Sequence, residues 1–336
     1  MQHMTRREVI KKAAIISTTL GMSMPMFSFK NNPINLMEEI VDVIIIGGSY
    51  AGLSAGLALG RSMKKVLIID NGLPCNRKTP HSHNFITQDG VKPQIIADRA
   101  KEQIIQYPNV NFLTSTVQSC HKNNQGFEVR CDDNQTFKTK KIIFATGIKD
   151  IMPEIPGFTS CWGISVIHCP YCHGYEYRMK NTGIMLNGDK AFHISQLVGN
   201  LTDKITILSN GKADFSNDQI SMLKKHHVTI INKKIDSLIH DNGHLKQVQF
   251  EDNSRMNFDV LYTSVPFTQH TTIPMELGCE LSESGYIQID QHYRTTIPGV
   301  YACGDNCSNM RSVAHAVFSG AMAGSSCNKD LTEETF

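Results

Sequence analysis

The sequence has almost no excess of charge of either sign. Its 336 residues carry 33 Lys and Arg against 31 Asp and Glu, which gives a formal net charge of +2. Beyond the N-terminus no basic cluster is dense enough to follow a phosphate backbone, so we expect no nucleic-acid partner. The chain also lacks internal repeats and low-complexity tracts. Its length and hydrophobic content of 40% are sufficient for two domains, each with its own core.

Cysteines are too sparse for a small disulfide-framework domain, since only ten occur in the whole chain. Two of them, Cys169 and Cys172, form a C-x-x-C pair, and the others are most simply small core or surface residues. No second C-x2-C or H-x3-H pair follows at the spacing of a zinc finger, although His168 and His173 are near. We therefore expect a redox dithiol and no metal; a metal site and inert packing are the alternatives.

Long hydrophobic runs are absent as well. Residues 13–29 form a mildly apolar run that is rich in Ser, Thr and Met and is too short and too weakly hydrophobic to span a membrane. It follows paired arginines, Arg6 and Arg7, in the layout of a twin-arginine export signal. We expect residues 1–36 to be such a signal and the protein to be exported to the periplasm. The alternative is a disordered extension on a cytoplasmic protein, and no clear cleavage site is visible.

The strongest α/β signal lies near the start of the folded chain. A β-branched run at residues 41–46 is typical of a buried parallel strand, and a helical segment follows the turn after it. Such a turn lets the backbone and the helix N-terminus receive a pyrophosphate, and Asp70 ends the next strand where an acid can bind a ribose. A glycine turn in another α/β unit is the alternative. The turn consists of Gly47, Gly48, Ser49, Tyr50, Ala51 and Gly52.

Two later segments have the character of the same domain. The strand at residues 141–144 runs into an A-T-G turn, and the segment at residues 298–305 reads P-G-V-Y-A-C-G-D. Asp305 follows a strand and a glycine, where an acid can bind a polyhydroxyl chain such as ribityl. A helix is expected from Arg311 to Gly324, with its positive dipole end free to face an electron-rich ring.

A second, weaker glycine turn follows the dithiol. Gly188 keeps one position of a dinucleotide fingerprint, but Leu186 stands at the place of the first glycine. The next strand, residues 204–208, ends without an acid for a ribose or an arginine pair for a 2'-phosphate. The pattern predicts a second Rossmann-like domain with a weak fingerprint for a nicotinamide nucleotide.

Together these motifs resemble the low-molecular-weight thioredoxin reductase family, over roughly residues 40 to 330. The resemblance implies an α/β fold with two Rossmann-like domains, in which a discontinuous FAD domain contains an inserted pyridine-nucleotide-type domain. It also implies a homodimer and a domain rotation that moves the dithiol between flavin and solvent. The implied boundaries are residues 39–151 and 274–331 for the FAD domain and residues 152–273 for the inserted domain, which carries the C-x-x-C.

The resemblance also implies residue roles. Cys172 would face the flavin, Cys169 would exchange with substrate, and His173 would replace the acid that the family usually has after the second cysteine. An imidazole can transfer a proton near neutral pH, and the alternative is a loop histidine without a role. NAD(P) contacts would come from Gly188, Asp189 and Ala191. FAD contacts would come from Gly47, Gly48, Ser49, Tyr50, Ala51, Gly52, Asp70, Asn84, Val117, Ala145, Thr146, Gly147, Gly304, Asp305, Arg311, Ser312 and Val313.

The expected function is that of an FAD-dependent thiol-disulfide oxidoreductase of thioredoxin reductase type. Electrons would pass between flavin, the Cys169/Cys172 disulfide and a substrate, either a small molecule or a thioredoxin-like protein, with NADPH or NADH as donor. The C-x-x-C-H-G-Y-E stretch also resembles the dithiol oxidases of gliotoxin-type pathways. An oxygen-dependent dithiol oxidase with a vestigial nicotinamide site is therefore the alternative, and a non-catalytic flavin redox sensor is a third reading.

The export signal is testable without the rest of the chain. Residues 1–36 fused to a folded reporter should carry it out of the cytoplasm, because the twin-arginine route exports folded proteins. A reporter that stays in the cytoplasm with Arg6 and Arg7 intact would remove this prediction.

Overall fold

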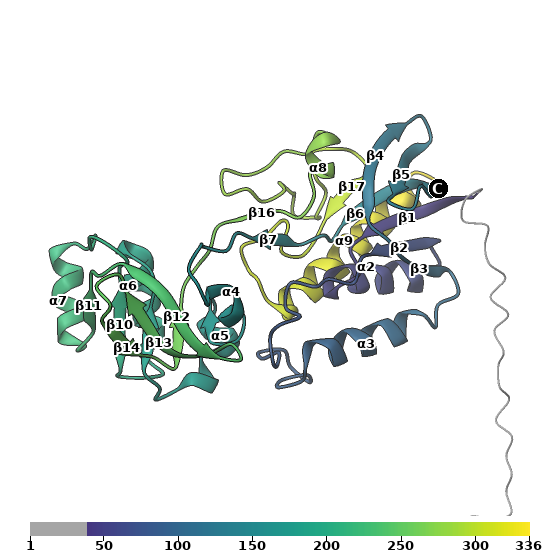
Figure 1. Ribbon diagram of the computed structural model, residues 1–336. Coiled ribbons are helices and arrows are strands. Elements are labelled where there is room, and N and C mark those ends of the chain that lie inside the picture. The colour runs from purple at the N-terminus through teal and green to yellow at the C-terminus, as the bar shows by residue number, and fades with distance from the viewer. Residues whose placement is uncertain (1–38) are drawn as a thin grey trace, which may run out of the picture. The chain divides into compact units, whose positions relative to one another are not determined.

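The computed structural model describes residues 39–336, and the predicted export signal lies outside them. The described chain contains two sheets of Rossmann type, each with its own helices (Figure 1). The predicted α/β class with two Rossmann-like domains is confirmed, and the exact domain boundaries stay predictions. No helix in this part of the chain is long and apolar enough to cross a membrane.

The first sheet joins segments from both ends of the chain. Its order is β3-β2-β1-β6-β5-β4, and β17, from much later in the sequence, pairs with β6. The pairs among β3, β2, β1, β6 and β17 are parallel, whereas β4, β5 and β6 pair antiparallel. The strands are β1 (Ile40–Ile46), β2 (Val66–Asp70), β3 (Val110–Thr114), β4 (Val117–Asn123), β5 (Gly126–Cys131), β6 (Thr136–Phe144) and β17 (Val300–Ala302).

The central strands of this sheet are buried on both faces. Ile44 of β1 belongs to one hydrophobic cluster and its neighbour Ile45 to another, and Leu67 and Ile68 of β2 divide in the same way. Successive side chains of a strand point to opposite faces, so both faces need apolar residues. This double burial explains the unbroken β-branched runs in the sequence. Each fully buried side chain of this size contributes about 1.5–3 kcal/mol.

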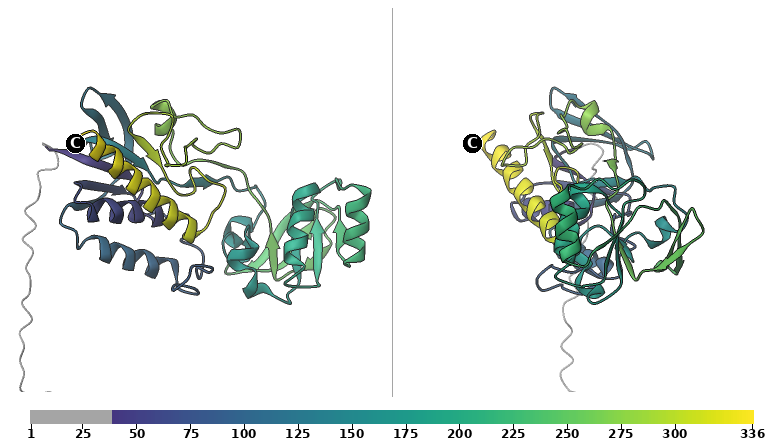
Figure 2. Two further views of the ribbon diagram at one scale, coloured as in Figure 1. Left: turned by 180° about the vertical axis from the view of Figure 1, so that it is seen from behind. Right: turned by 90° about the vertical axis from the view of Figure 1, so that its left-hand side faces the viewer.

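Three helices accompany this sheet, namely α2 (Tyr50–Arg61), α3 (Pro93–Ile104) and α9 (Val313–Glu333). α9 lies alongside α2, as both views show (Figures 1 and 2). The approach is so close that a Cβ on Gly320 would lie 2.1 Å from the backbone oxygen of Ala51. A Cβ on Gly324 would lie 2.7 Å from the oxygen of Ala55. Glycine in α9 therefore lets two segments far apart in the sequence meet backbone to backbone.

The second sheet is parallel and has the order β11-β10-β9-β15-β8. It belongs with helices α6 (Gly188–Val198) and α7 (Asn217–Lys225) and with a separate antiparallel sheet of three strands. Its strands are β8 (Val166–Ile167), β9 (Thr182–Ile184), β10 (Ile205–Leu208), β11 (Thr229–Ile231) and β15 (Val260–Tyr262). The separate sheet consists of β12 (Ile235–Asp241), β13 (His244–Phe250) and β14 (Arg255–Asn257).

The chain passes between the two Rossmann-type sheets twice, and the two crossings are paired. β7 (Ile148–Asp150) leads out and β16 (Phe267–Gln269) leads back, as an antiparallel ladder with Asp150 opposite Phe267. Three short helical segments, α4 (Phe158–Cys161), α5 (Pro170–His173) and η1 (Tyr175–Tyr177), follow the first crossing, and α8 (Ile273–Glu276) follows the second. The dithiol thus belongs to the chain that is inserted between these crossings.

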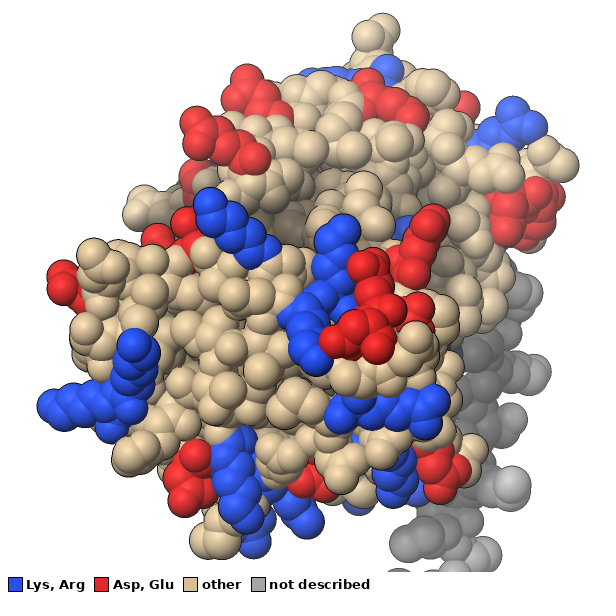
Figure 3. Space-filling view, turned by 60° about the vertical axis from the view of Figure 1, so that its left-hand side comes forward, with Lys and Arg blue, Asp and Glu red and all other residues tan. Residues whose placement is uncertain are grey.

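Charges of both signs are mixed over the surface. On the face in Figure 3, Lys and Arg side chains lie among Asp and Glu side chains around a broad uncharged area. This distribution agrees with the small net charge of the sequence.

Candidate functional site

The glycine turn after β1 has the geometry of a dinucleotide-binding turn. Gly47 has a φ of 105°, and a Cβ there would lie 2.3 Å from the oxygen of Ala145. A Cβ on Gly52 would lie 1.8 Å from the oxygen of Gly47. The backbone N–H of Gly48 donates to Asp70 Oδ1 at 2.8 Å, which ties the turn to the acid at the end of β2. Only glycine fits these positions, and a turn of this kind lets the backbone at the start of a helix bind a phosphate group.

The turn after β17 lies against the same helix. Gly304 has a φ of 83°, and a Cβ on it would lie 3.0 Å from the Cβ of Ala51 in the first turn of α2. Its backbone N–H donates to Ser319 Oγ in α9 at 3.0 Å. The structure therefore brings together the first glycine turn, the A-T-G turn after β6 and the Gly304-Asp305 turn, as the sequence predicts.

Asp305 lies in a buried and polar environment. Burial raises the pKa of its carboxyl to about 6, although Arg311 opposes this shift with its Nε 3.7 Å from Oδ2. Arg311 itself donates to both carboxylate oxygens of Asp150, at 2.9 and 3.0 Å. The Nε of Arg311 and the Oδ1 of Asn306 are buried without a hydrogen-bond partner. Buried polar atoms of this kind need partners, so the residues present fit a large polar ligand such as FAD.

The other predicted FAD residues occupy several positions. Ser49 precedes α2 and Ser312 precedes α9 as N-cap residues, and the Oγ of Ser312 accepts from the His315 N–H at 3.1 Å. Asn84 has a φ of 57° in the loop between β2 and α3. Val117 begins β4 and pairs with Cys131 in the core of the first sheet. Tyr50 and Val313 are the first residues of α2 and α9, and Thr146 lies 3.4 Å from the Asn306 amide.

The two cysteines form a disulfide, with Cα atoms 5.3 Å apart. The Sγ of Cys169 also accepts a hydrogen bond from the backbone N–H of Cys172 at 3.1 Å. Gly174 follows this turn at a position where no side chain fits. A Cβ there would lie 2.3 Å from the oxygen of Pro170 and 2.5 Å from Leu201. Both cysteines are half-buried, so their exposure does not separate their roles.

Histidines surround the disulfide. His173 directly follows Cys172, and its ring makes an edge contact with His83, with ring centroids 6.5 Å apart. Burial lowers the pKa of His173; a charge on His83 lowers it further and Glu176 raises it. His168, just before the disulfide, stacks on Trp162 at 5.9 Å. Burial lowers the pKa of His168 to about 4, which keeps its ring neutral.

Sequence reasoning missed the residues that connect these parts. Asp150 accepts from Arg311 and also from Trp162 Nε1, at 3.2 Å. His83 lies within ion-pair distance of Glu176. Asp150 lies in a segment that the sequence identifies only as a crossover between domains. His83 lies in the polar loop at residues 75–90, which is too long for a plain connection and has the length of loops that line sites, but no motif distinguishes its position.

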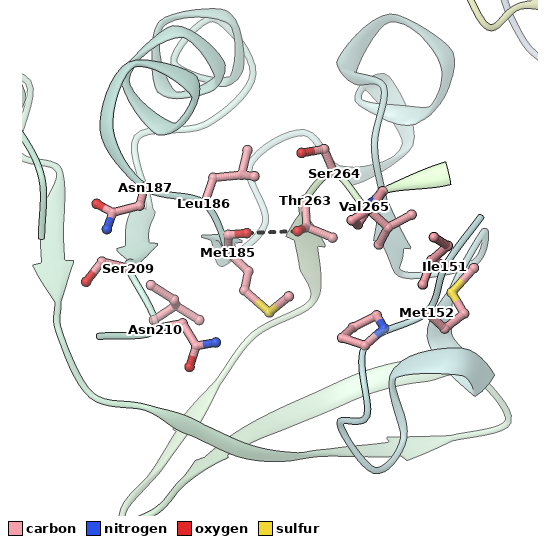
Figure 4. Close-up of a pocket in the computed structure, with 13 residues that line it drawn as sticks. Ile151, Met152, Met185, Leu186, Asn187, Ser209, Asn210, Thr263, Ser264 and Val265 are labelled. Atoms are coloured by element: carbon pink, nitrogen blue, oxygen red, sulfur yellow. Dashed lines mark hydrogen bonds between the residues drawn. The ribbon is translucent and has the colours of Figure 1, made fainter. Parts of the chain in front are cut away.

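A pocket of about 350 Å³ lies at the carboxyl ends of the second sheet's strands. Nucleotides bind at this edge in doubly wound folds, and the volume is in the range of ligand sites. In Figure 4, Met185 and Leu186 lie on one side of the pocket and Ile151 and Met152 on the other. Thr263 donates to the Met185 oxygen at 2.8 Å across the floor.

The polar lining of this pocket is largely used by the protein itself. Asn187 Oδ1 accepts from the N–H groups of Gly188 and Asp214, and Asn210 Oδ1 accepts from Ile235 N–H. No Lys or Arg is among the lining residues of the described chain. Of the predicted NAD(P) residues, Gly188 begins α6 with a φ of 56°, Asp189 accepts from Gln219, and Ala191 is fully buried. The pocket fits a nicotinamide nucleotide by place and size, but it offers no cation for a 2'-phosphate.

The role of Asp305 in flavin binding can be tested by substitution. Asp305→Ala should weaken FAD binding about tenfold or more, because a hydrogen bond to a charged group contributes about 1.5–3 kcal/mol. FAD retained after gel filtration, measured by flavin absorbance per chain, reports this loss. Asp203→Ala, at an exposed position beside β10, is the matched control and should retain wild-type flavin. Equal retention in both variants would contradict the assignment.

Comparison with known proteins agrees with this geometry. Residues 41–320 match the family model described as pyridine nucleotide-disulphide oxidoreductase. Thioredoxin reductase tcpT of Claviceps purpurea is 31% identical over 305 residues, covering 88% of this chain and 95% of that protein. Thioredoxin reductase sirT of Leptosphaeria maculans is 31% identical, covering 86% and 94%.

Solved structures give the same result. TrxB of Bacillus anthracis is 31% identical with a TM-score of 0.84, covering 88% of this chain and 100% of that one. An oxidoreductase of Agrobacterium tumefaciens is 34% identical with a TM-score of 0.82, covering 88% and 99%. The relatives named thioredoxin reductase favour the predicted reductase over the alternative dithiol oxidase. The chain belongs to the pyridine nucleotide-disulphide oxidoreductase family and is an oxidoreductase of its thioredoxin reductase type, which uses FAD and NAD(P)H.

Proposed function

We propose that the enzyme reduces a disulfide substrate by way of the Cys169–Cys172 pair. The observation that carries this proposal is the disulfide itself, formed within a turn that contains a half-buried histidine. FAD supplies two-electron transfer between the nicotinamide nucleotide and this disulfide when both cofactors are bound. The reactions at sulfur depend on the chain's own residues.

Cys169 is suited to exchange with the substrate. In the disulfide its Sγ accepts a hydrogen bond from the Cys172 N–H at 3.1 Å, within the same turn of the chain. A hydrogen bond to sulfur stabilises a thiolate, which is the reactive form in thiol-disulfide exchange. Cys172 is then the cysteine that resolves the mixed disulfide and faces the flavin.

His173 is placed to transfer the proton that this exchange requires. It is next to Cys172 in sequence, and burial lowers its pKa, so that its ring is mostly neutral near pH 7 and can accept a proton. The same ring, once protonated, can return the proton to a leaving thiolate.

The surface beside the dithiol suits a partly apolar substrate. Tyr171, between the two cysteines, is 70% exposed, and Tyr175 and Met179 are also exposed. A disulfide-containing molecule that approaches Cys169 meets these side chains first. The names of the relatives support a thioredoxin-like protein as one such substrate.

Anaerobic mixing tests the proposed direction of electron flow. Holoenzyme mixed with NADH or NADPH should lose its oxidised flavin absorbance, and an added disulfide should restore it. Because the pocket lining has no cation for a 2'-phosphate, we expect NADH to act at least as well as NADPH. Reduction by a dithiol alone, with peroxide formed when air is admitted, would contradict the proposal.

The cysteine variants are matched controls for each other. Cys172→Ser retains Cys169 and should trap a stable mixed disulfide with the substrate. Cys169→Ser should trap little, because Cys172 faces the flavin. The reverse pattern would exchange the two roles.

We also propose that the enzyme is a homodimer. The outer side of α9 near its start is uncharged, and Phe318 is 57% exposed there, with Met310 just before the helix 62% exposed. Apolar surface of this kind is typical of subunit contacts. The Phe318→Lys variant should sediment largely as a monomer in analytical ultracentrifugation, whereas the wild type should sediment as a dimer. Met179→Lys, at an exposed position between η1 and β9, should sediment as the wild type does. A wild-type monomer at micromolar concentration would contradict this proposal.

A further inference from the structure

His83 connects two parts of the chain that lie far apart in sequence. It belongs to the polar loop between β2 and α3, and its side chain is only 19% exposed. Its Nδ1 lies 3.6 Å from Asp89 Oδ1 in the same loop. Its Nε2 lies 3.5 Å from Glu176 Oε1, four residues after Cys172. One imidazole therefore lies between two carboxylates from different elements.

The other contact of His83 leads to the dithiol. Its ring meets the ring of His173 edge-on, and His173 directly follows Cys172. The side chains of Asp89 and Glu176 are 68% and 39% exposed, so both reach solvent. His83 therefore lies between two carboxylates that reach solvent and the edge of the His173 ring.

We propose that His83 is a positioning and proton-relay residue, which orients His173 and connects it to solvent through Asp89 and Glu176. This inference rests on the proposed function of the Cys169–Cys172 pair. It concerns how protons reach that pair, and not which substrate is reduced.

The chemistry requires such a path. When the disulfide accepts an electron pair from reduced flavin, the bond between the sulfurs breaks, one sulfur remains a thiolate and the other takes a proton. His173 gives this proton, and His83 replaces it from solvent. In substrate reduction the Cys169 thiolate attacks one sulfur of the substrate disulfide, which forms a mixed disulfide and releases the first substrate thiolate. Cys172 then gives its proton to His173 and attacks the Cys169 sulfur, which re-forms the Cys169–Cys172 disulfide and releases the second substrate thiolate. One substrate thiolate takes the proton from His173, and the other takes a proton from solvent. The electrons come from NAD(P)H through FAD, so atoms and charges balance.

The charge of His83 determines how many of the two carboxylates its ring can bind by hydrogen bonds, and so how firmly the ring is held. A neutral imidazole has a single N–H and can donate to one carboxylate only, whereas protonated His83 can donate to both. The titratable groups that face His83 are His81, Asp89, His173 and Glu176.

The electrostatic effects on His173 have opposite signs, which makes the proposal testable. A charge on His83 lowers the pKa of His173, and the charge on Glu176 raises it. Loss of the His83 charge should raise the pKa of His173, because repulsion is removed. Loss of the Glu176 charge should lower it, because attraction is removed.

The experiment is an NMR titration of the His173 ring in holoenzyme labelled on histidine. His83→Gln should raise the pKa of His173 by about 0.5 unit or more, and Glu176→Gln should lower it by a similar amount. His81→Gln, the same substitution two residues away on an exposed side chain, should shift the pKa of His173 much less, because His83 and not His81 contacts the His173 ring. The pH at which the rate of disulfide turnover changes should shift together with the pKa of His173 in each variant. Added imidazole should restore turnover in His83→Gln and leave His81→Gln unchanged.

Shifts of the same sign in His83→Gln and Glu176→Gln, or an equal effect of His81→Gln, would overturn the relay. Such a result would mean that His83 only supports the loop. If His83→Gln does not fold, Glu176→Gln alone decides, since a pKa of His173 that stays constant or rises contradicts the proposal. The titration is independent of turnover. An enzyme that reduces no disulfide yet shows the opposite shifts would refute the proposed function and leave the electrostatic coupling in place.

Discussion

The buried ion pair between Arg311 and Asp150 holds together the parts on which this enzyme depends. Its side chains are only 17% and 10% exposed, and the guanidinium donates to both carboxylate oxygens. Arg311 comes from the segment before α9, and Asp150 ends the first crossing strand. Loss of either partner would leave a buried charge, at a cost of about 3–5 kcal/mol. Because Asp150 also binds Trp162, the flavin side of the molecule is linked to the chain that carries the dithiol.

This ion pair depends in turn on the close packing of α9 against α2. The glycines of α9 allow its backbone to reach Ala51 and Ala55, and this contact fixes the late segment beside the first glycine turn. Segments more than 250 residues apart in sequence, such as Ser54 and Val317, are joined there by hydrogen bonds. The site is therefore assembled by tertiary packing. The sequence shows its parts only as separate motifs and does not show that they meet.

The strong local signals of the sequence predict the structure well. The β-branched runs of β1 and β2 and the glycine turn between β1 and α2 follow from double burial and from steric contacts that only glycine permits. Strands such as β4 and β12 were not predicted, because each has one exposed face and too few buried residues to give a clear alternation. The α7 helix was missed although Ser216 and Gln219 form a capping box, since its apolar face is narrow and only Leu223 is buried.

The residues of the candidate site also fall into those that the sequence predicts and those that it does not. The dithiol and the glycine turns have sequence signatures because their chemistry requires fixed residue types at fixed spacing. Asp150 and His83 have none, because their roles arise from contacts between segments that are distant in the chain. Glu176 ends the C-x-x-C-H-G-Y-E stretch, but its contact with His83 arises only in the fold. Position in space, and not residue type, makes these ordinary residues part of the site.

The most direct test of the central claim is a count of electrons. Anaerobic reductive titration of the holoenzyme measures how many electron pairs each chain accepts. If Cys169–Cys172 is redox-active, the wild type will accept one electron pair more than a Cys169→Ser variant, whose only acceptor is the flavin. Equal uptake by the two proteins would show that the disulfide takes no part in electron transfer.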